Sequence, residues 1–172
     1  LKEIESSSGA SQLPAEAIVR LAACDPAKAV ECIDKYLASG PTDFFRKAVA
    51  TIDKSVALGT LLKFSDAQSL LGDTSNQSII ATFPVVSEIA DKWKARLGAL
   101  QSIASSSVPP EQKRALRDDL LRTVGVTGEY ELARIADLVF GVATSDESLL
   151  LHVYFGTPSD AFREIIVKSA PW

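Results

Sequence analysis

The sequence predicts an all-α protein with eight or nine short amphipathic helices in a compact, bundle-like domain. Apolar residues recur at three- and four-residue steps, and polar caps, prolines and glycines interrupt them at helix-length intervals. The composition is 47% apolar but only 7% aromatic, so small aliphatic residues dominate and favour close helix packing. The one strand-like run, at residues 79–83, has no comparable partner strand, and a sheet needs partners.

The first elements follow from capping signals. Residues 1–13 are polar and small and are expected to form a flexible arm, and an all-helical domain is expected over 14–172. Pro14 opens the first predicted helix. Asp25 and Pro26 start a second helix that runs to Gly40, a residue suited to a left-handed C-terminal cap.

The next two helices are expected to begin at hydroxyl side chains. Thr42 is the predicted cap of a helix that Gly59 closes. Ser65 is the predicted cap of a short helix that ends near Gly72. Residues 73–77, DTSNQ, are expected to form a turn.

Proline and serine mark the middle of the chain. The run SIIATFP is expected to be a helix that ends or kinks at Pro84. Residues 85–104 form a longer amphipathic helix, and SSSVPP at 105–110 is the candidate subdomain break.

Four further helices are predicted after this break. The first begins at Pro109–Pro110 and is stopped by Gly125, and the second follows Thr127. The third begins at residues 145–147, and a final amphipathic helix begins near Asp160.

One phrase occurs twice. AVECIDKYLASG at 29–40 and AVATIDKSVALG at 48–59 agree at seven of twelve positions, with an offset of nineteen residues. That offset is too short for a two-helix solenoid repeat, so we expect two antiparallel helices packed on each other. Asp34 with Lys54, or Asp53 with Lys35, is then expected to pair across the contact.

Charge and side-chain chemistry narrow the function classes. The net charge is −4, which gives little basis for nucleic-acid binding, and no apolar run approaches the ~18 residues of a membrane span. His152 is the only histidine, and Cys24 and Cys32 fit no common zinc spacing. Two free buried thiols are the main expectation and a single disulfide is the alternative. No catalytic signature is present, and we expect the protein not to be an enzyme.

Three stretches resemble a known family. AKAVECIDKYLASG, then DFFRKAVATIDKSVALG, then IIATFP are similar in order and spacing to the peridinin–chlorophyll proteins of dinoflagellates, over roughly residues 26–95. The resemblance implies a non-enzymatic helical protein that binds chlorophyll or carotenoid, or an accessory subunit of a photosystem or antenna. It also implies the plastid thylakoid lumen, reached after removal of a targeting segment.

One departure from the family affects the expected pigment site. The two family histidines that precede Lys-Ala-Ile-Gly fall at Ile52 and Asp53 in this chain. The candidate cofactor-binding residues are therefore His152, Asp53 and Asp34. The sequence context LLLHVYF also favours a simpler interpretation of His152, as a core or half-buried side chain bonded to backbone.

The alternative function is a helical interaction subunit of a larger assembly that holds no ligand. Aromatic residues concentrate binding energy at interfaces, so Trp93, Tyr154 and Trp172 are its candidate anchors.

Overall fold

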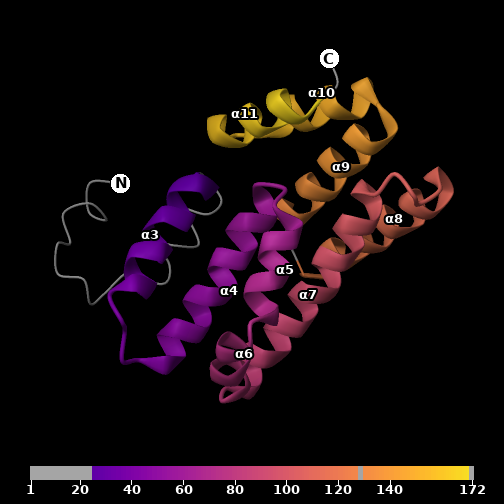
Figure 1. The fold of residues 1–172 in the computed structure, drawn as a ribbon. Helices are drawn as coiled ribbons and strands as arrows, with labels where there is room; N and C mark the ends of the chain where they lie inside the picture. Colours follow the sequence, from indigo (N-terminus) through magenta and orange to yellow (C-terminus); the bar gives the residue numbers. More distant parts are fainter. Residues whose placement is uncertain (1–24, 128–129, 171–172) are drawn as a thin grey trace. The chain divides into compact units, whose positions relative to one another are not determined.

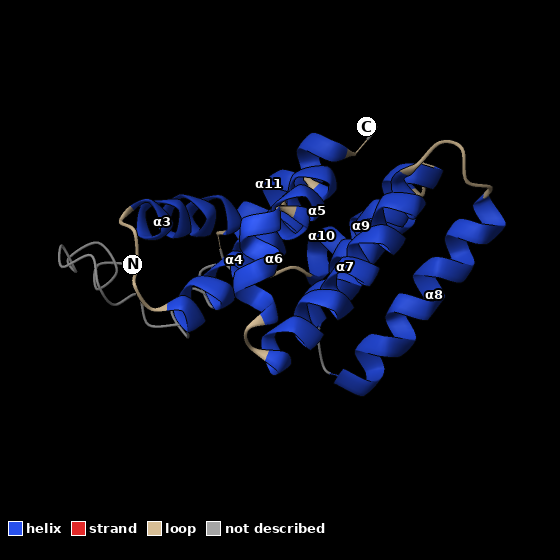
Figure 2. Cartoon of the chain, turned by 60° about the horizontal axis from the view of Figure 1, so that its bottom comes forward, coloured by secondary structure: helices blue, strands red, loops and turns tan. Residues whose placement is uncertain are grey.

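The computed structural model describes residues 25–127 and 130–170, and all regular elements in these ranges are α-helices (Figures 1 and 2). The predicted all-α class is confirmed. The nine described helices are α3 (Pro26–Ala38), α4 (Phe44–Thr60), α5 (Phe64–Gly72), α6 (Thr74–Ala81), α7 (Pro84–Ala104), α8 (Pro110–Thr127), α9 (Tyr130–Thr144), α10 (Glu147–Gly156) and α11 (Asp160–Ser169). None of them is long and apolar enough to cross a membrane. The predicted arm at 1–13 and the helix at Pro14 lie outside the described residues.

The helices form two compact units. One contains the described residues up to Lys94 and the other those from Ala95, so the division falls inside α7. The serine- and proline-rich stretch at 105–110 follows this division. Residues 105–109 form the loop between α7 and α8, and Pro110 is the first residue of α8.

In the first unit, α4 is the central helix. α3 and α5 lie on opposite sides of it, and α6 also packs against it (Figure 1). Nine of its 17 residues are buried. Trp93 of α7 donates from its indole nitrogen to Ser55 Oγ at 3.0 Å, and Ser55 donates in turn to the Ala67 carbonyl of α5 at 3.2 Å. This buried chain of hydrogen bonds ties three helices together.

Three helices of this unit have an aspartate as their N-cap residue, including α4, for which a threonine was predicted. Asp25 caps α3 as predicted, but Asp43 rather than Thr42 caps α4, accepting from the Arg46 backbone N–H at 3.0 Å. A carboxylate at this position also interacts favourably with the helix dipole. Asp73 caps α6, so the predicted turn at 73–77 is helical from Thr74 onward.

The prediction that Ser65 caps α5 is wrong. This helix begins at Phe64, so Ser65 lies inside it, and Lys63 at the cap position makes no side-chain cap hydrogen bond.

The prediction that glycines end helices is confirmed at Gly40 and wrong at two other positions. Gly40 does adopt the left-handed conformation after α3, with φ +67°. Gly59 and Gly125 do not end their helices and lie within α4 and α8. After α4 the left-handed residue is Leu62, φ 60°, and the next N–H, that of Lys63, donates to the Leu58 carbonyl at 2.9 Å.

In the second unit, α9 packs between α8 and α10, and α11 packs on α10. Arg117 of α8 binds Asp137 of α9, with 2.6 Å between Nε and Oδ1, and its guanidinium lies 5.3 Å from the centre of the Phe140 ring. At Gly141 the two helices α9 and α10 approach closely, because a Cβ there would lie 2.9 Å from Leu150 Cδ2.

Candidate functional site: a helix contact and exposed apolar faces

The duplicated phrase builds the contact between α3 and α4. Ala29 packs with Ala57, and Ile33 and Tyr36 pack with Ala50, so the helices run antiparallel as predicted. Ala29 and Ala57 are both completely buried. Such small side chains bring the two backbones close together.

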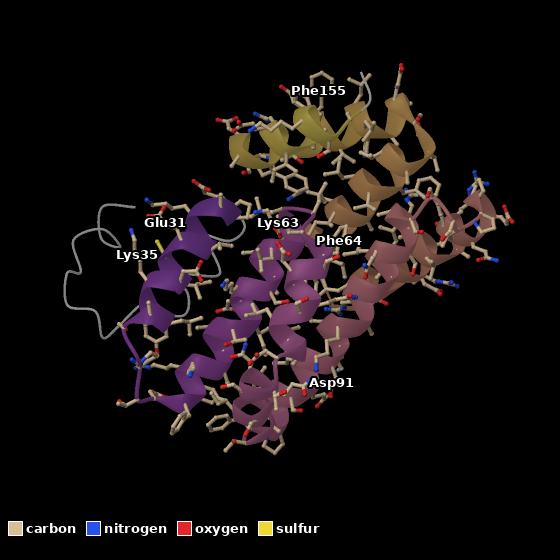
Figure 3. All side chains as sticks on the ribbon, viewed as in Figure 1. Glu31, Lys35, Lys63, Phe64, Asp91 and Phe155 are labelled. Carbon is tan, nitrogen blue, oxygen red and sulfur yellow. The ribbon has the colours of Figure 1, made fainter. Side chains whose placement is uncertain are left out.

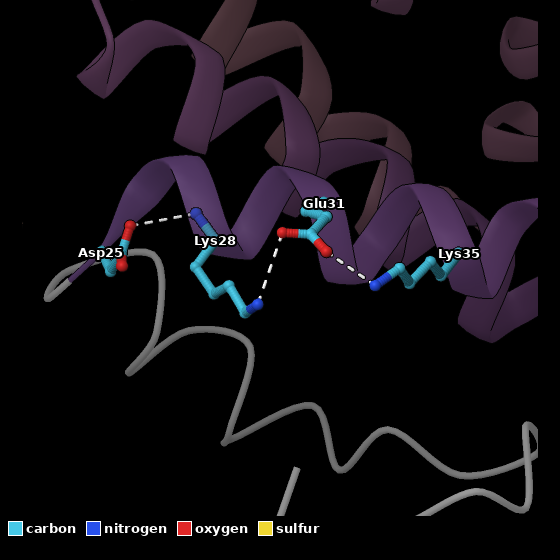
Figure 4. A network of polar contacts seen from close by, with 4 residues as sticks. All are labelled: Asp25, Lys28, Glu31 and Lys35. Carbon is cyan, nitrogen blue, oxygen red and sulfur yellow. Dashed lines mark hydrogen bonds and ion pairs between the residues drawn. The ribbon is translucent and has the colours of Figure 1, made fainter. Parts of the chain in front are cut away.

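One of the two alternative ion pairs across this contact forms. Lys54 Nζ lies 2.6 Å from Asp34 Oδ1. Lys35 instead binds Glu31 on its own helix, at 2.6 Å, and Glu31 also binds Lys28 at 3.4 Å (Figure 4). Figure 3 places Glu31 and Lys35 on the side of α3 that faces away from α4. These side chains are exposed or half-exposed, and exposed pairs contribute about 0–1 kcal/mol.

Asp53, the counterpart of Asp34 in the second copy, has a different environment. It lies three residues after Ala50 and four before Ala57, and therefore on the side of α4 that faces α3. Its Oδ2 is buried and has no hydrogen-bond partner. Burial raises the pKa of this carboxyl from 3.8 to about 6.

The contact does not fit a pigment ring between the two helices. Ile52, at the position of one family histidine, is buried and apolar, and a ring between α3 and α4 would have to separate Ala29 from Ala57. Elsewhere in the described chain, no three His, Cys, Asp or Glu side chains come together as a metal site would require.

The remaining predicted ligands lie apart from this contact. His152 is exposed on α10, so the interpretation of it as a core or half-buried side chain is wrong. The reason is that α10 buries only Leu150 and Val153, and His152 lies on the opposite face. Cys32 is a half-buried free thiol packed beside Ala29 and Ala57, and Cys24 lies outside the described residues.

The predicted aromatic anchors have three different outcomes. Trp93 is 6% exposed and bonded to Ser55, so it belongs to the core and the prediction of a surface anchor is wrong. Tyr154 is half-buried, with the Arg163 guanidinium 5.8 Å from its ring centre. Trp172 lies outside the described residues.

Exposed apolar side chains lie at the first turn of α4 and at the start of α7, and one ring contact links the two segments. Phe44 is 59% exposed and Phe45 51%, and the Phe45 ring meets the Phe83 ring edge to face at 5.3 Å. Val85 and Ile89, one turn apart on α7, are 70% and 51% exposed. We call these five residues the phenylalanine patch. The sequence does contain a signal for this exposed surface, the pair Phe44–Phe45 directly after a helix cap. Two adjacent residues of a helix point in different directions and cannot both lie on one buried face.

A second exposed apolar surface lies on α10. Leu151 and Phe155, also one turn apart, are 45% and 77% exposed, and Phe155 projects outward from its helix (Figure 3). His152 lies beside Leu151 on the chain. An isolated exposed apolar residue is ordinary, whereas several together are typical of binding surfaces.

Three comparisons with known proteins found no relative of this chain. The chain matches no protein-family model, no curated protein and no solved structure.

Proposed function

We propose that this protein is a helical interaction subunit that docks onto an apolar segment of a partner protein through the phenylalanine patch. The observation that carries the proposal is the exposure of Phe44 and Phe45 together with Val85 and Ile89. Aromatic and aliphatic side chains grouped in this way provide the apolar centre of protein interfaces.

The charges around the patch support a protein partner. Asp43 pairs with Arg46 at 3.4 Å, and Glu88 pairs with Lys92 at 2.7 Å. Acidic and basic groups are balanced at the rim, whereas nucleic acid or an anionic membrane surface would require an excess of basic side chains. An apolar centre with a mixed, paired rim suits a protein surface.

The sequence resemblance supports one class of partner. It implies a photosystem or antenna complex, with this protein as an accessory subunit on the lumenal side of the thylakoid membrane. Under this proposal, the patch is the surface that contacts the complex.

A photo-crosslinking residue placed at position 44 tests the docking role in source cells. We expect one discrete crosslinked protein, and none from the same residue placed at Ser69, an exposed polar position of α5. That protein, once purified, should bind the chain directly, and Phe44→Ser with Phe45→Ser should weaken binding at least tenfold. Leu151→Ser, an exposed apolar change in the other unit, is the matched control. Equal crosslinking at both positions, or unchanged binding by the double variant, would contradict the proposal.

A second candidate is that the protein carries chlorophyll or carotenoid. One observation favours it: Asp53, at the position of a family histidine, has a buried oxygen that no donor satisfies. The closed contact of Ala29 with Ala57 means that such a pigment would have to bind elsewhere on α4 or separate the helices. A visible absorption spectrum of protein from its native source tests this candidate. Chlorophyll and carotenoid bands in fixed ratio to protein would support it, and a spectrum without them would overturn it.

A further inference from the structure

Asp53 is the most unusual charged residue in the first unit. One of its oxygens is buried without a donor, on the face of α4 that carries Ala50 and Ala57. A buried carboxylate without a partner is unfavourable, whereas the neutral acid loses much less on leaving water. The contact between α3 and α4 therefore discriminates between the two protonation states of this side chain.

The neighbouring charges do not relieve this burial. On α4 the adjacent Lys54 is engaged by Asp34 of α3. Cys32 and Tyr36 lie in the contact of α3 with α4, but neither acts on the Asp53 carboxyl. Lys28 and Lys35 both pair with Glu31 on α3, and Asp66 and Asp73 lie in the first turn of α5 and at the cap of α6. The raised pKa of Asp53 has burial as its cause, with no charged group acting on it.

Among the described helices, α3 packs extensively against α4 alone. It packs along one side of α4, opposite α5 (Figure 1). The segment that joins α3 to α4 includes Gly40, with φ +67°, and Pro41, so the helix ends sharply before the next one begins. Separation of α3 from α4 would give Asp53 back to water and uncover Ile33 and Ala50.

We propose that α3 is an acid-stabilised flap, docked on α4 while Asp53 is neutral and released more often once Asp53 is ionised. Release exposes the packed apolar faces of both helices to water, more often at neutral than at acid pH. This inference does not depend on the phenylalanine patch or on a pigment.

Hydrogen exchange of the α3 amides, corrected for intrinsic rates, tests the flap at about pH 5 and about pH 7.5. If the carboxyl titrates near 6 in the docked state and near 3.8 in the released state, opening should become about tenfold more frequent at the higher pH. Asp53→Asn should remove this pH dependence. Asp34→Asn, the same change at the equivalent position of the first copy, should retain it. Histidines in general change charge in this range, so His152→Gln is a second control that should also retain it.

Three results would overturn the flap. One is α3 protection that is the same at both pH values in the unaltered protein, a measurement that requires no variant to fold. Another is an Asp53→Asn protein that is helical by circular dichroism and retains the full pH dependence. Uniform loss of protection in α4 and α5 as well as α3 would also contradict it, because that pattern is unfolding of the whole unit.

Discussion

α3 and α4 contain nearly the same twelve-residue phrase, yet its residues have different environments in the two helices. In α3, Asp34 is half-exposed and paired with Lys54, and Ala38 is exposed. In α4 the phrase lies on the central helix, where Asp53 is half-buried with one buried oxygen that has no hydrogen-bond partner, and Ala57 is completely buried. The difference shows that neighbouring helices, rather than local sequence, determine the role of each residue.

Substitutions at the two equivalent alanines are expected to show the largest difference in stability between the copies. Ala57→Leu should lower the free energy of unfolding by about 1–3 kcal/mol, because added volume has to fit between α4 and α3. Ala38→Leu changes the equivalent residue of the first copy, which is exposed, and should alter it by no more than about 0.5 kcal/mol. Urea unfolding followed by circular dichroism measures both. Equal losses at the two positions would break the comparison.

The two aspartates test the same comparison with a substitution that is expected to stabilise the protein. Asp53→Asn should raise the free energy of unfolding by about 1–3 kcal/mol at neutral pH, because it removes a buried charge that is unfavourable there. The folded-state pKa of about 6 lies above the unfolded value of 3.8. Asp53 therefore makes the unaltered protein less stable as the pH rises from about 4 to about 6, and the gain from Asn should disappear at about pH 4. Denaturant titrations at both pH values measure this difference. A variant that is less stable than the unaltered protein at neutral pH would contradict it.

Position 55 provides a third test of the comparison, because the two copies differ there: the second copy has Ser55 where the first has Tyr36. Ser55→Ala should cost about 1–3 kcal/mol, because the indole N–H of Trp93 would remain buried without an acceptor. Thermal unfolding followed by tryptophan fluorescence measures the loss. Ser69→Ala, on an exposed site of α5, is the control and should be nearly neutral. A neutral Ser55→Ala would indicate that water replaces the hydroxyl.

Substitution of Gly40, the last residue of the first copy, is expected to have the smallest effect on stability. Gly40→Ala should cost about 1 kcal/mol, because an L-residue is strained at φ +67°. Gly72→Ala, in a helical position with open space around it, should be neutral or slightly stabilising. Calorimetric melting temperatures compare the two. If both changes destabilise equally, the left-handed conformation of Gly40 is not what limits substitution there.

Much of the fold could be predicted because it depends on local signals. The Asp25–Pro26 start, the break before Pro84 and the long helix over 85–104 all follow from capping, proline chemistry and apolar spacing. The antiparallel pairing of α3 with α4 followed from the repeated phrase and its short connection. These features depend on residues that are close together in the sequence.

The rest depended on contacts between distant residues. The sequence alone did not separate Asp53 from Asp34, since burial against α3 is a tertiary property. Trp93 was proposed as an interface anchor because it is aromatic, and nothing local indicates that Ser55, 38 residues earlier, accepts its hydrogen bond. His152 was expected inside because its segment is apolar, although only one face of α10 is covered.

The most direct measurement is a carboxyl-carbon NMR titration of Asp53, assigned by comparison with Asp53→Asn. A midpoint near 6 is predicted, because one carboxylate oxygen is buried without a hydrogen-bond donor. A midpoint near the ordinary value of 3.8 would contradict this. It would mean that Asp53 is as accessible as the outer residues of the first copy, and that the two copies of the phrase are not distinguished by their neighbours.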